Sequence, residues 1–231
     1  MKKLFQFFGK FRKLFNKYVI ATVIVVIVLS VGGYFGFKQY EKKYYADPKI
    51  MTLSDEQRQN YEKRKQEIFE TLKEFPDYFE LYLELGQIDR NLGNYQQAIN
   101  HNKLATKIIK TSSAPYMNIG VYLVELGHYQ DAEYYFKKAV KLTPDYYLVY
   151  QKLGDLYRNY YKKGTFDKAV KVYQDGITAT NDDRLVKDFA DYLSENGYKN
   201  EALKYYKQLE EVSPEDEMLR ELNKQLEESL K

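Results

Sequence analysis

The sequence predicts an all-α protein, a solenoid of repeated helix pairs that follows a single membrane-spanning helix. Two observations lead to this fold class. Gly86, Gly120 and Gly154 stand 34 residues apart twice over, and the stretch 18–37 holds twenty residues without a charge. A fixed period of this length is typical of helical repeat proteins. An apolar stretch of about 20 residues is long enough to cross a bilayer, so the 231 residues divide into an attachment segment and one domain.

The first 17 residues form a basic leader that carries six Lys or Arg and no acid. The rest of the chain holds 30 basic and 33 acidic residues and has a net charge of −3. A nucleic-acid-binding body would show the opposite balance, so nucleic acid is not an expected partner. The leader's apolar residues fit an amphipathic helix on the inner leaflet, although a plain basic flank explains them equally well. These residues are Leu4, Phe8, Phe11, Leu14, Phe15 and Tyr18.

Residues 18–37 read YVIATVIVVIVLSVGGYFGF and are predicted to form a transmembrane helix. At about 1.5 Å per residue, such a helix spans roughly 30 Å, the hydrocarbon thickness of a bilayer. A cleaved signal peptide is the alternative, but no Ala-x-Ala cleavage site follows. Six Lys or Arg precede the span and four Lys follow closely, which predicts a cytoplasmic N-terminus and an extracytoplasmic body at the cell membrane.

Gly32 and Gly36 form a G-x-x-x-G at the outer end of this span. Small residues at this spacing let two membrane helices approach closely. The motif is a weak signal for a dimer contact in the membrane, and a homo-oligomer is therefore a possible assembly.

Residues 38–53 are predicted to be a polar spacer, and 54–78 an N-terminal capping helix. Beyond them, an aromatic residue stands four positions before each of the periodic glycines, at Tyr82, Tyr116 and Tyr150. Two antiparallel helices that cross closely need a small residue at the crossing and a large one in the neighbouring hole. One such pair cannot bury its apolar face alone, so several must stack. The turn glycine, aromatic residue and alanine that come downstream of each periodic glycine are Gly93, Tyr95 and Ala98; Gly127, Tyr129 and Ala132; Gly164, Phe166 and Ala169.

This pattern resembles the tetratricopeptide repeat family, which implies a right-handed α-solenoid. The matching units are 79–112, 113–146, 147–182 and 183–216, and 217–231 is similar to the capping helix that shields a last repeat. The unit 113–146 matches the family signature nearly everywhere. The unit 79–112 departs from it, because Asp89, Asn102 and Lys110 stand where a large residue, an aromatic residue and a proline are usual.

No residues point to catalysis, a cofactor or a metal site. The chain has no cysteine, and none of the phosphate-binding, nucleophile-elbow or zinc-protease motifs is present. His101 and His128 lack a second histidine at ligand spacing and are expected at the surface. The chain is therefore not expected to be an enzyme.

The resemblance implies that other proteins bind along the concave surface lined by the first helix of each repeat. Some family members grip a C-terminal carboxylate with Lys and Asn there, but only Asn118 and Lys152 keep those residue types in this chain. The apolar side chains instead favour a groove for an amphipathic helix or an extended apolar segment. The alternative is that the chain's own terminal or capping helix fills the groove. The candidate groove residues are Leu83, Gln87, Met117, Asn118, Val121, Val124, Leu148, Gln151, Lys152 and Asp155.

These features together predict a membrane-anchored scaffold or adaptor that holds other proteins, with its solenoid outside the cytoplasm, in support of an envelope assembly or secretion machine. The alternative is a cytosol-facing receptor for targeting signals or chaperones. An enzyme with its active site in the solenoid has no support from the residues.

Overall fold

A computed structural model describes residues 53–160 and 164–230 of the chain. The predicted leader, the membrane helix with Gly32 and Gly36, and nearly all of the spacer lie outside these residues. Over the described part the protein is all-α, with ten helices and no strand, and none of these helices combines the length and the apolar character needed to cross a membrane. The helices are α2 (Asp55–Glu74), α3 (Phe79–Asn91), α4 (Tyr95–Ile108), α5 (Ala114–Glu125), α6 (Tyr129–Leu142), α7 (Tyr147–Asn159), α8 (Phe166–Thr180), α9 (Asp183–Glu195), α10 (Lys199–Val212) and α11 (Glu217–Glu228).

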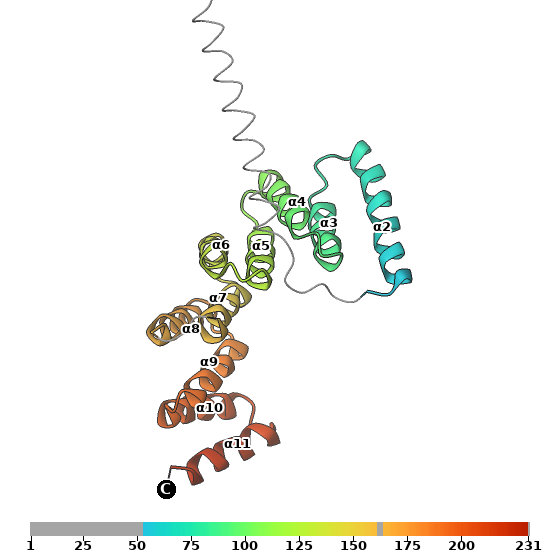
Figure 1. Ribbon diagram of the computed structural model, residues 1–231. Helices are drawn as coiled ribbons and strands as arrows, with labels where there is room; N and C mark the ends of the chain where they lie inside the picture. The colour runs from blue at the N-terminus through green and yellow to red at the C-terminus, as the bar shows by residue number, and fades with distance from the viewer. Residues whose placement is uncertain (1–52, 161–163, 231) are drawn as a thin grey trace, which may run out of the picture. The chain divides into compact units, whose positions relative to one another are not determined.

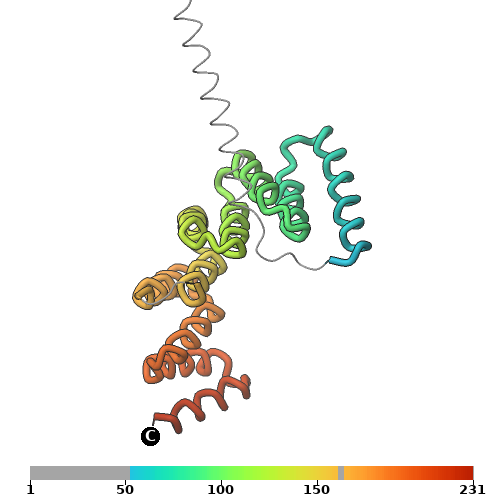
Figure 2. The backbone as a smooth tube through the Cα atoms, in the orientation of Figure 1, coloured from blue at the N-terminus to red at the C-terminus, as the bar shows by residue number. Residues whose placement is uncertain are grey.

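The helices from α3 to α10 form four consecutive pairs (Figure 1). The most extensive packing is within the pairs α3–α4, α5–α6, α7–α8 and α9–α10, and each pair then packs against the next. We call α3, α5, α7 and α9 the first helices. They contact one another in sequence along the array, α2 packs on α3, and α11 packs on α10. Figure 2 follows this succession along the backbone. The described domain is therefore a solenoid in which contacts join neighbouring units.

Glycines close the turns that follow the first helices. Gly93, Gly127 and Gly197 have φ values of 80°, 78° and 85°, and Gly164, in the longer turn after α7, has a φ of 96°. Positive φ costs glycine little because it has no Cβ, and it lets the chain reverse at the end of a helix. The sequence thus ends each first helix at the turn from which the second helix starts.

The helix crossings pair a small residue with a large one. Gly120 on α5 lies against the ring of the buried Phe136 on α6, and a Cβ at Gly154 on α7 would stand 2.6 Å from Cζ of Tyr173 on α8. In the first repeat Asn102 takes the place of the aromatic ring and faces Gly86. Its side chain is fully buried, and Nδ2 donates to the Ala98 carbonyl at 2.9 Å. The predicted complementarity is present in all three pairs, with an amide in place of a ring in one of them.

The two end helices start at side-chain caps. Ser54 and Gln57 form a reciprocal capping box at the start of α2, and the Asp216 carboxylate accepts the Leu219 N–H at the start of α11. Such caps satisfy backbone N–H groups that lack a partner within the helix. Ile68 of α2 is buried beside α3, and α11 buries Leu219 and Leu226. Each end helix therefore covers one end of the stack with an amphipathic face.

Candidate functional site

The first helices are joined to one another by side chains that recur in register. Counting from the central glycine of a repeat, Arg90 is residue +4 of the first repeat, and Glu125 is residue +5 of the second. The Arg90 guanidinium donates two hydrogen bonds to the Glu125 carboxylate, one of them from Nε to Oε2 at 2.8 Å. This bidentate ion pair links α3 to α5.

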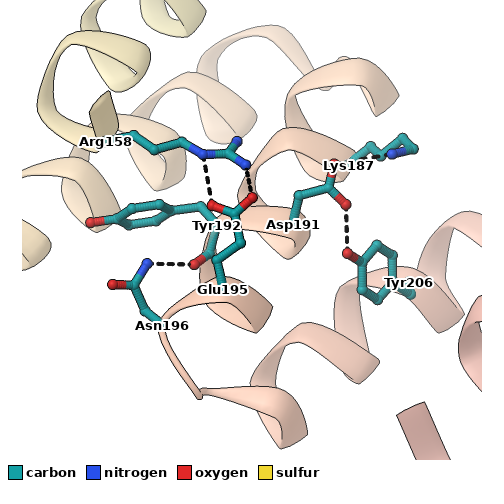
Figure 3. A network of polar contacts seen from close by, with 7 residues as sticks. All are labelled: Arg158, Lys187, Asp191, Tyr192, Glu195, Asn196 and Tyr206. Atoms are coloured by element: carbon teal, nitrogen blue, oxygen red, sulfur yellow. Dashed lines mark hydrogen bonds and ion pairs between the residues drawn. The ribbon is translucent and has the colours of Figure 1, made fainter. Parts of the chain in front are cut away.

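The same pair recurs between the third and fourth repeats. Arg158 is residue +4 after Gly154, and Glu195 is residue +5 after Ala190, which occupies the glycine position of the fourth repeat. Nε of Arg158 donates to Oε2 of Glu195 at 2.9 Å, and its Nη2 donates to the other carboxylate oxygen (Figure 3). We call the Arg90–Glu125 and Arg158–Glu195 pairs the Arg–Glu bridges. Paired guanidinium and carboxylate groups of this geometry are the most directional ion pairs in proteins.

The junction between the second and third repeats has no such bridge. Its +4 residue is Val124 on α5 and its +5 residue is Asn159 on α7, and neither side chain carries a charge. Both line a pocket of about 190 Å³. We call this the open junction. Its lining residues are Val121, Val124, Glu125, Phe136, Lys152, Asp155, Leu156, Asn159 and Tyr160.

Two charges on α7 face the open junction, Lys152 and Asp155. Asp155 forms no hydrogen bond or ion pair to another described residue. Burial raises the pKa of its carboxyl above the ordinary value; the charge of Lys152 opposes this shift and that of Asp188 on α9 adds to it. Glu125, by contrast, is held by Arg90 and by the Tyr95 hydroxyl at 3.1 Å. The open junction therefore holds one half-buried carboxylate that lacks a direct partner.

Four predicted groove residues meet at the open junction: Val121, Val124, Lys152 and Asp155. The others do not line this pocket. Asn118 donates to Asn102 Oδ1 at 3.0 Å on the neighbouring α4, and Gln151 donates to Asp188 Oδ2 at 2.6 Å on α9. Gln87 is exposed and donates to Asn91 along its own helix, and the apolar Leu83, Met117 and Leu148 are half-buried on the first helices.

A buried charge cluster at the start of the array was not predicted. Asp89 on α3 is fully buried; Lys65 Nζ of α2 lies 2.6 Å from its Oδ1, and His101 Nε2 of α4 lies 3.1 Å from its Oδ2. Burial alone would raise the Asp89 pKa, but His101 and Lys65 outweigh it and hold the pKa below its ordinary value. The prediction that His101 lies at the surface is wrong, since its side chain is only 17% exposed. The departure at Asp89 was the one signal in the sequence that could have revealed the cluster.

The described part of the chain shows no arrangement of side chains for a metal ion. No group of three or more His, Cys, Asp or Glu is arranged there to hold a metal ion. The Asp89 cluster joins three helices and is a packing element.

Comparison with known proteins identifies the repeats. Models of the tetratricopeptide repeat match residues 79–111 and 113–146. The chain contains tetratricopeptide repeats. Over 80 residues it is also 35% identical to the human protein Superkiller complex protein 3, a stretch that covers 35% of this chain and 5% of that protein.

Solved tetratricopeptide structures share the fold. MamA superposes with a TM-score of 0.54 at 25% identity, covering 71% of this chain and 96% of that one. TTC0263, a thermophilic tetratricopeptide protein of Thermus thermophilus, gives a TM-score of 0.52 at 21% identity, covering 72% and 90%. These likenesses confirm an all-α solenoid of tetratricopeptide type.

Proposed function

We propose that the chain is a membrane-anchored scaffold that binds a segment of another protein along the face formed by its first helices. The open junction carries this proposal, because it combines an apolar wall with accessible charge at the centre of the array. Tetratricopeptide repeats are protein-interaction modules, which supports a scaffold role. The anchor is proposed from the uncharged stretch 18–37 of the sequence.

The proposed occupant is an amphipathic helix or an extended apolar segment. Val121 and Val124 of α5 line the open junction, and Met117, one turn before Val121 on the same helix, is half-buried. Met117, Val121 and Val124 stand at i, i+4 and i+7 and share one face of α5, which offers an apolar stripe to the apolar face of a bound helix. On α11, Leu219 and Leu226 are buried, and the helix packs on α10 at the end of the array remote from α3. Its position supports a partner, rather than the chain's own capping helix, as the occupant.

The test is a double substitution on α5. Met117→Asp with Val121→Asp places two carboxylates on the apolar wall, and a bound apolar segment would have to desolvate both. The probe is a fluorescently labelled peptide selected on the protein. We expect the affinity of the full-length protein in detergent for this peptide to fall at least a hundredfold in a fluorescence-anisotropy titration. The far-ultraviolet circular dichroism should keep its helical signal. Undiminished binding would contradict the proposal.

Orientation is tested by labelling, because the chain has no native cysteine. Asn200 is exposed on α10, so Asn200→Cys provides a single accessible thiol. We expect a membrane-impermeant maleimide to label it in intact cells, which corresponds to an extracytoplasmic scaffold of an envelope or secretion assembly. Labelling only after lysis would favour the alternative, a cytosol-facing receptor for targeting signals or chaperones.

A further inference from the structure

The open junction differs from its neighbours in the residues at +4 and +5 and in having a pocket at its surface. At the flanking junctions the +4 and +5 positions are occupied by Arg and Glu, which join successive first helices by an ion pair. At the open junction Val124 and Asn159 leave a pocket of about 190 Å³. A cavity of roughly 150 Å³ in another protein admits benzene, so this pocket has room for one large side chain and not for a helix.

The lining of the pocket combines apolar and charged side chains. Val121 and Val124 of α5 are half-buried and supply accessible apolar surface, and the lining also includes the buried Phe136 of α6 and Leu156 of α7. Asp155 supplies a half-buried carboxylate that has no direct partner among the described residues, and Asp188 stands near enough to act on it. Among the described residues, Lys152 is the one cation in the lining, beside the carboxylates of Glu125 and Asp155. Arg90 pairs with Glu125, and Arg158, which also acts on Asp155, pairs with Glu195. In the described part of the chain this leaves Lys152 against the charges of Asp155 and Asp188, with one negative charge in excess.

We propose that the open junction receives a single lysine or arginine side chain of the bound protein segment, with its methylene groups against Val121 and Val124 and its charged end at Asp155. Long basic side chains bury their aliphatic stems along apolar surface while the charge stays at a polar site. The incoming cation neutralises a carboxylate on a first helix, as Arg90 and Arg158 neutralise Glu125 and Glu195 at the flanking junctions. This inference rests on the proposed function, since it names the residue by which the groove recognises its segment.

The probe is a peptide selected on the protein itself. A phage-displayed library of random 15-residue peptides is selected on the immobilised full-length chain in detergent, and a selected peptide is synthesised with a fluorescent label. We expect the selected sequences to share one Lys or Arg flanked by apolar residues. Replacing that residue with norleucine, which keeps the aliphatic stem and removes the charge, should weaken binding at least tenfold, as expected for a charge-assisted hydrogen bond.

The protein variants test whether Asp155 receives this charge. Asp155→Asn should weaken binding of the basic peptide at least tenfold and should have no further effect on the norleucine peptide, because both changes remove the same contact. Glu221→Gln, an exposed acid on α11 outside the open junction, is the matched control and should leave the affinity unchanged. Additive losses, equal losses for Asp155→Asn and Glu221→Gln, or selected peptides without a shared basic residue would overturn the inference.

A second variant tests the pocket without depending on Asp155. Val124→Arg with Asn159→Glu installs the residues of the Arg–Glu bridge at the open junction. We expect this protein to unfold at or above the parent temperature and to lose peptide binding at least tenfold. Retained binding in the folded variant would overturn the inference. If Met117→Asp with Val121→Asp abolishes binding while this variant and Asp155→Asn do not, the proposed groove stands and the basic-residue pocket fails. If no peptide is selected, both are contradicted.

Discussion

Single side chains decide how neighbouring helices of this protein are held, and Asp89 is the most constrained of them. It is fully buried, and it contacts Lys65 from α2 and His101 from α4. The sequence marked position 89 as a departure from the repeat pattern. Its partners could not be predicted, because the pairing requires α2 to pack on α3 and brings together residues 24 and 12 positions away. A buried charge is tolerated when it is paired.

Asp89→Asn should destabilise the protein by about 3 kcal/mol at neutral pH, because it breaks a buried ion pair and leaves Lys65 without its counter-charge. The Asp89 pKa is lowered in the folded state. Its contribution is therefore present above the unfolded pKa of about 3.9 and is lost as the pH falls through the folded value. Urea titrations at pH 7 and pH 3 measure this difference.

Glu62→Gln, an exposed acid on α2, is the matched control for Asp89→Asn and should have little effect at either pH. A loss for Asp89→Asn that stayed constant down to pH 3 would contradict the assignment of the stability to an ionised Asp89.

At the scale of the element, the helix pair is specified by the glycine at its crossing. Gly120 lies against the Phe136 ring, which is 2% exposed, so an added Cβ would overlap the ring. Overpacking of a core costs about 1–3 kcal/mol, while alanine in a helix gains up to about 1 kcal/mol over glycine. Gly120→Ala should therefore lose about 1–2 kcal/mol of stability in a chemical unfolding experiment.

Gly127→Ala separates crowding from backbone strain. No atom stands within 4 Å of a Cβ at this turn residue, so its cost, about 1 kcal/mol, comes from the positive φ alone. Adding Phe136→Leu should recover part of the Gly120→Ala loss and none of the Gly127→Ala loss. Equal responses of the two variants would show that the ring does not limit the crossing.

Most of the helix pairs could be predicted from the sequence, because the period of the glycines follows from the close packing of two helices within each repeat. The recurrence of Gly86, Gly120 and Gly154 predicted helix pairs, and the matches over 79–111 and 113–146 confirm tetratricopeptide repeats. The open junction was predicted only in part. Val121, Val124, Lys152 and Asp155 were named as groove residues, but the Arg–Glu bridges that isolate them depend on the register of two successive repeats. Counting from each glycine to +4 and +5 would have found that register.

The whole described domain is a linear array in which each unit is held by its neighbours. The end helices have one neighbour each along the array, since α2 packs on α3 and α11 on α10. In such an array stability is a sum of unit and junction terms, and the ends open most easily. Native-state hydrogen exchange should therefore show the highest protection in α5 to α8 and the lowest in α2 and α11. Uniform protection across all ten helices would indicate one cooperative unit.

The Arg–Glu bridges recur at the same two positions of successive repeats, so each junction of the array can be described by its residues at +4 and +5. Four repeats make three junctions; two of them carry an Arg–Glu bridge between their first helices, and the third has a pocket lined by Val124 and Asn159. On the proposed function, the residues that set where a partner docks are distinct from those that build the helix crossings. Exchanging the residues at +4 and +5 between neighbouring junctions should move this pocket by one repeat along the array. The residues at the helix crossings would stay the same. On this proposal, two substitutions per junction are enough to change where the solenoid binds its protein segment, and the arrangement of its helices does not have to change.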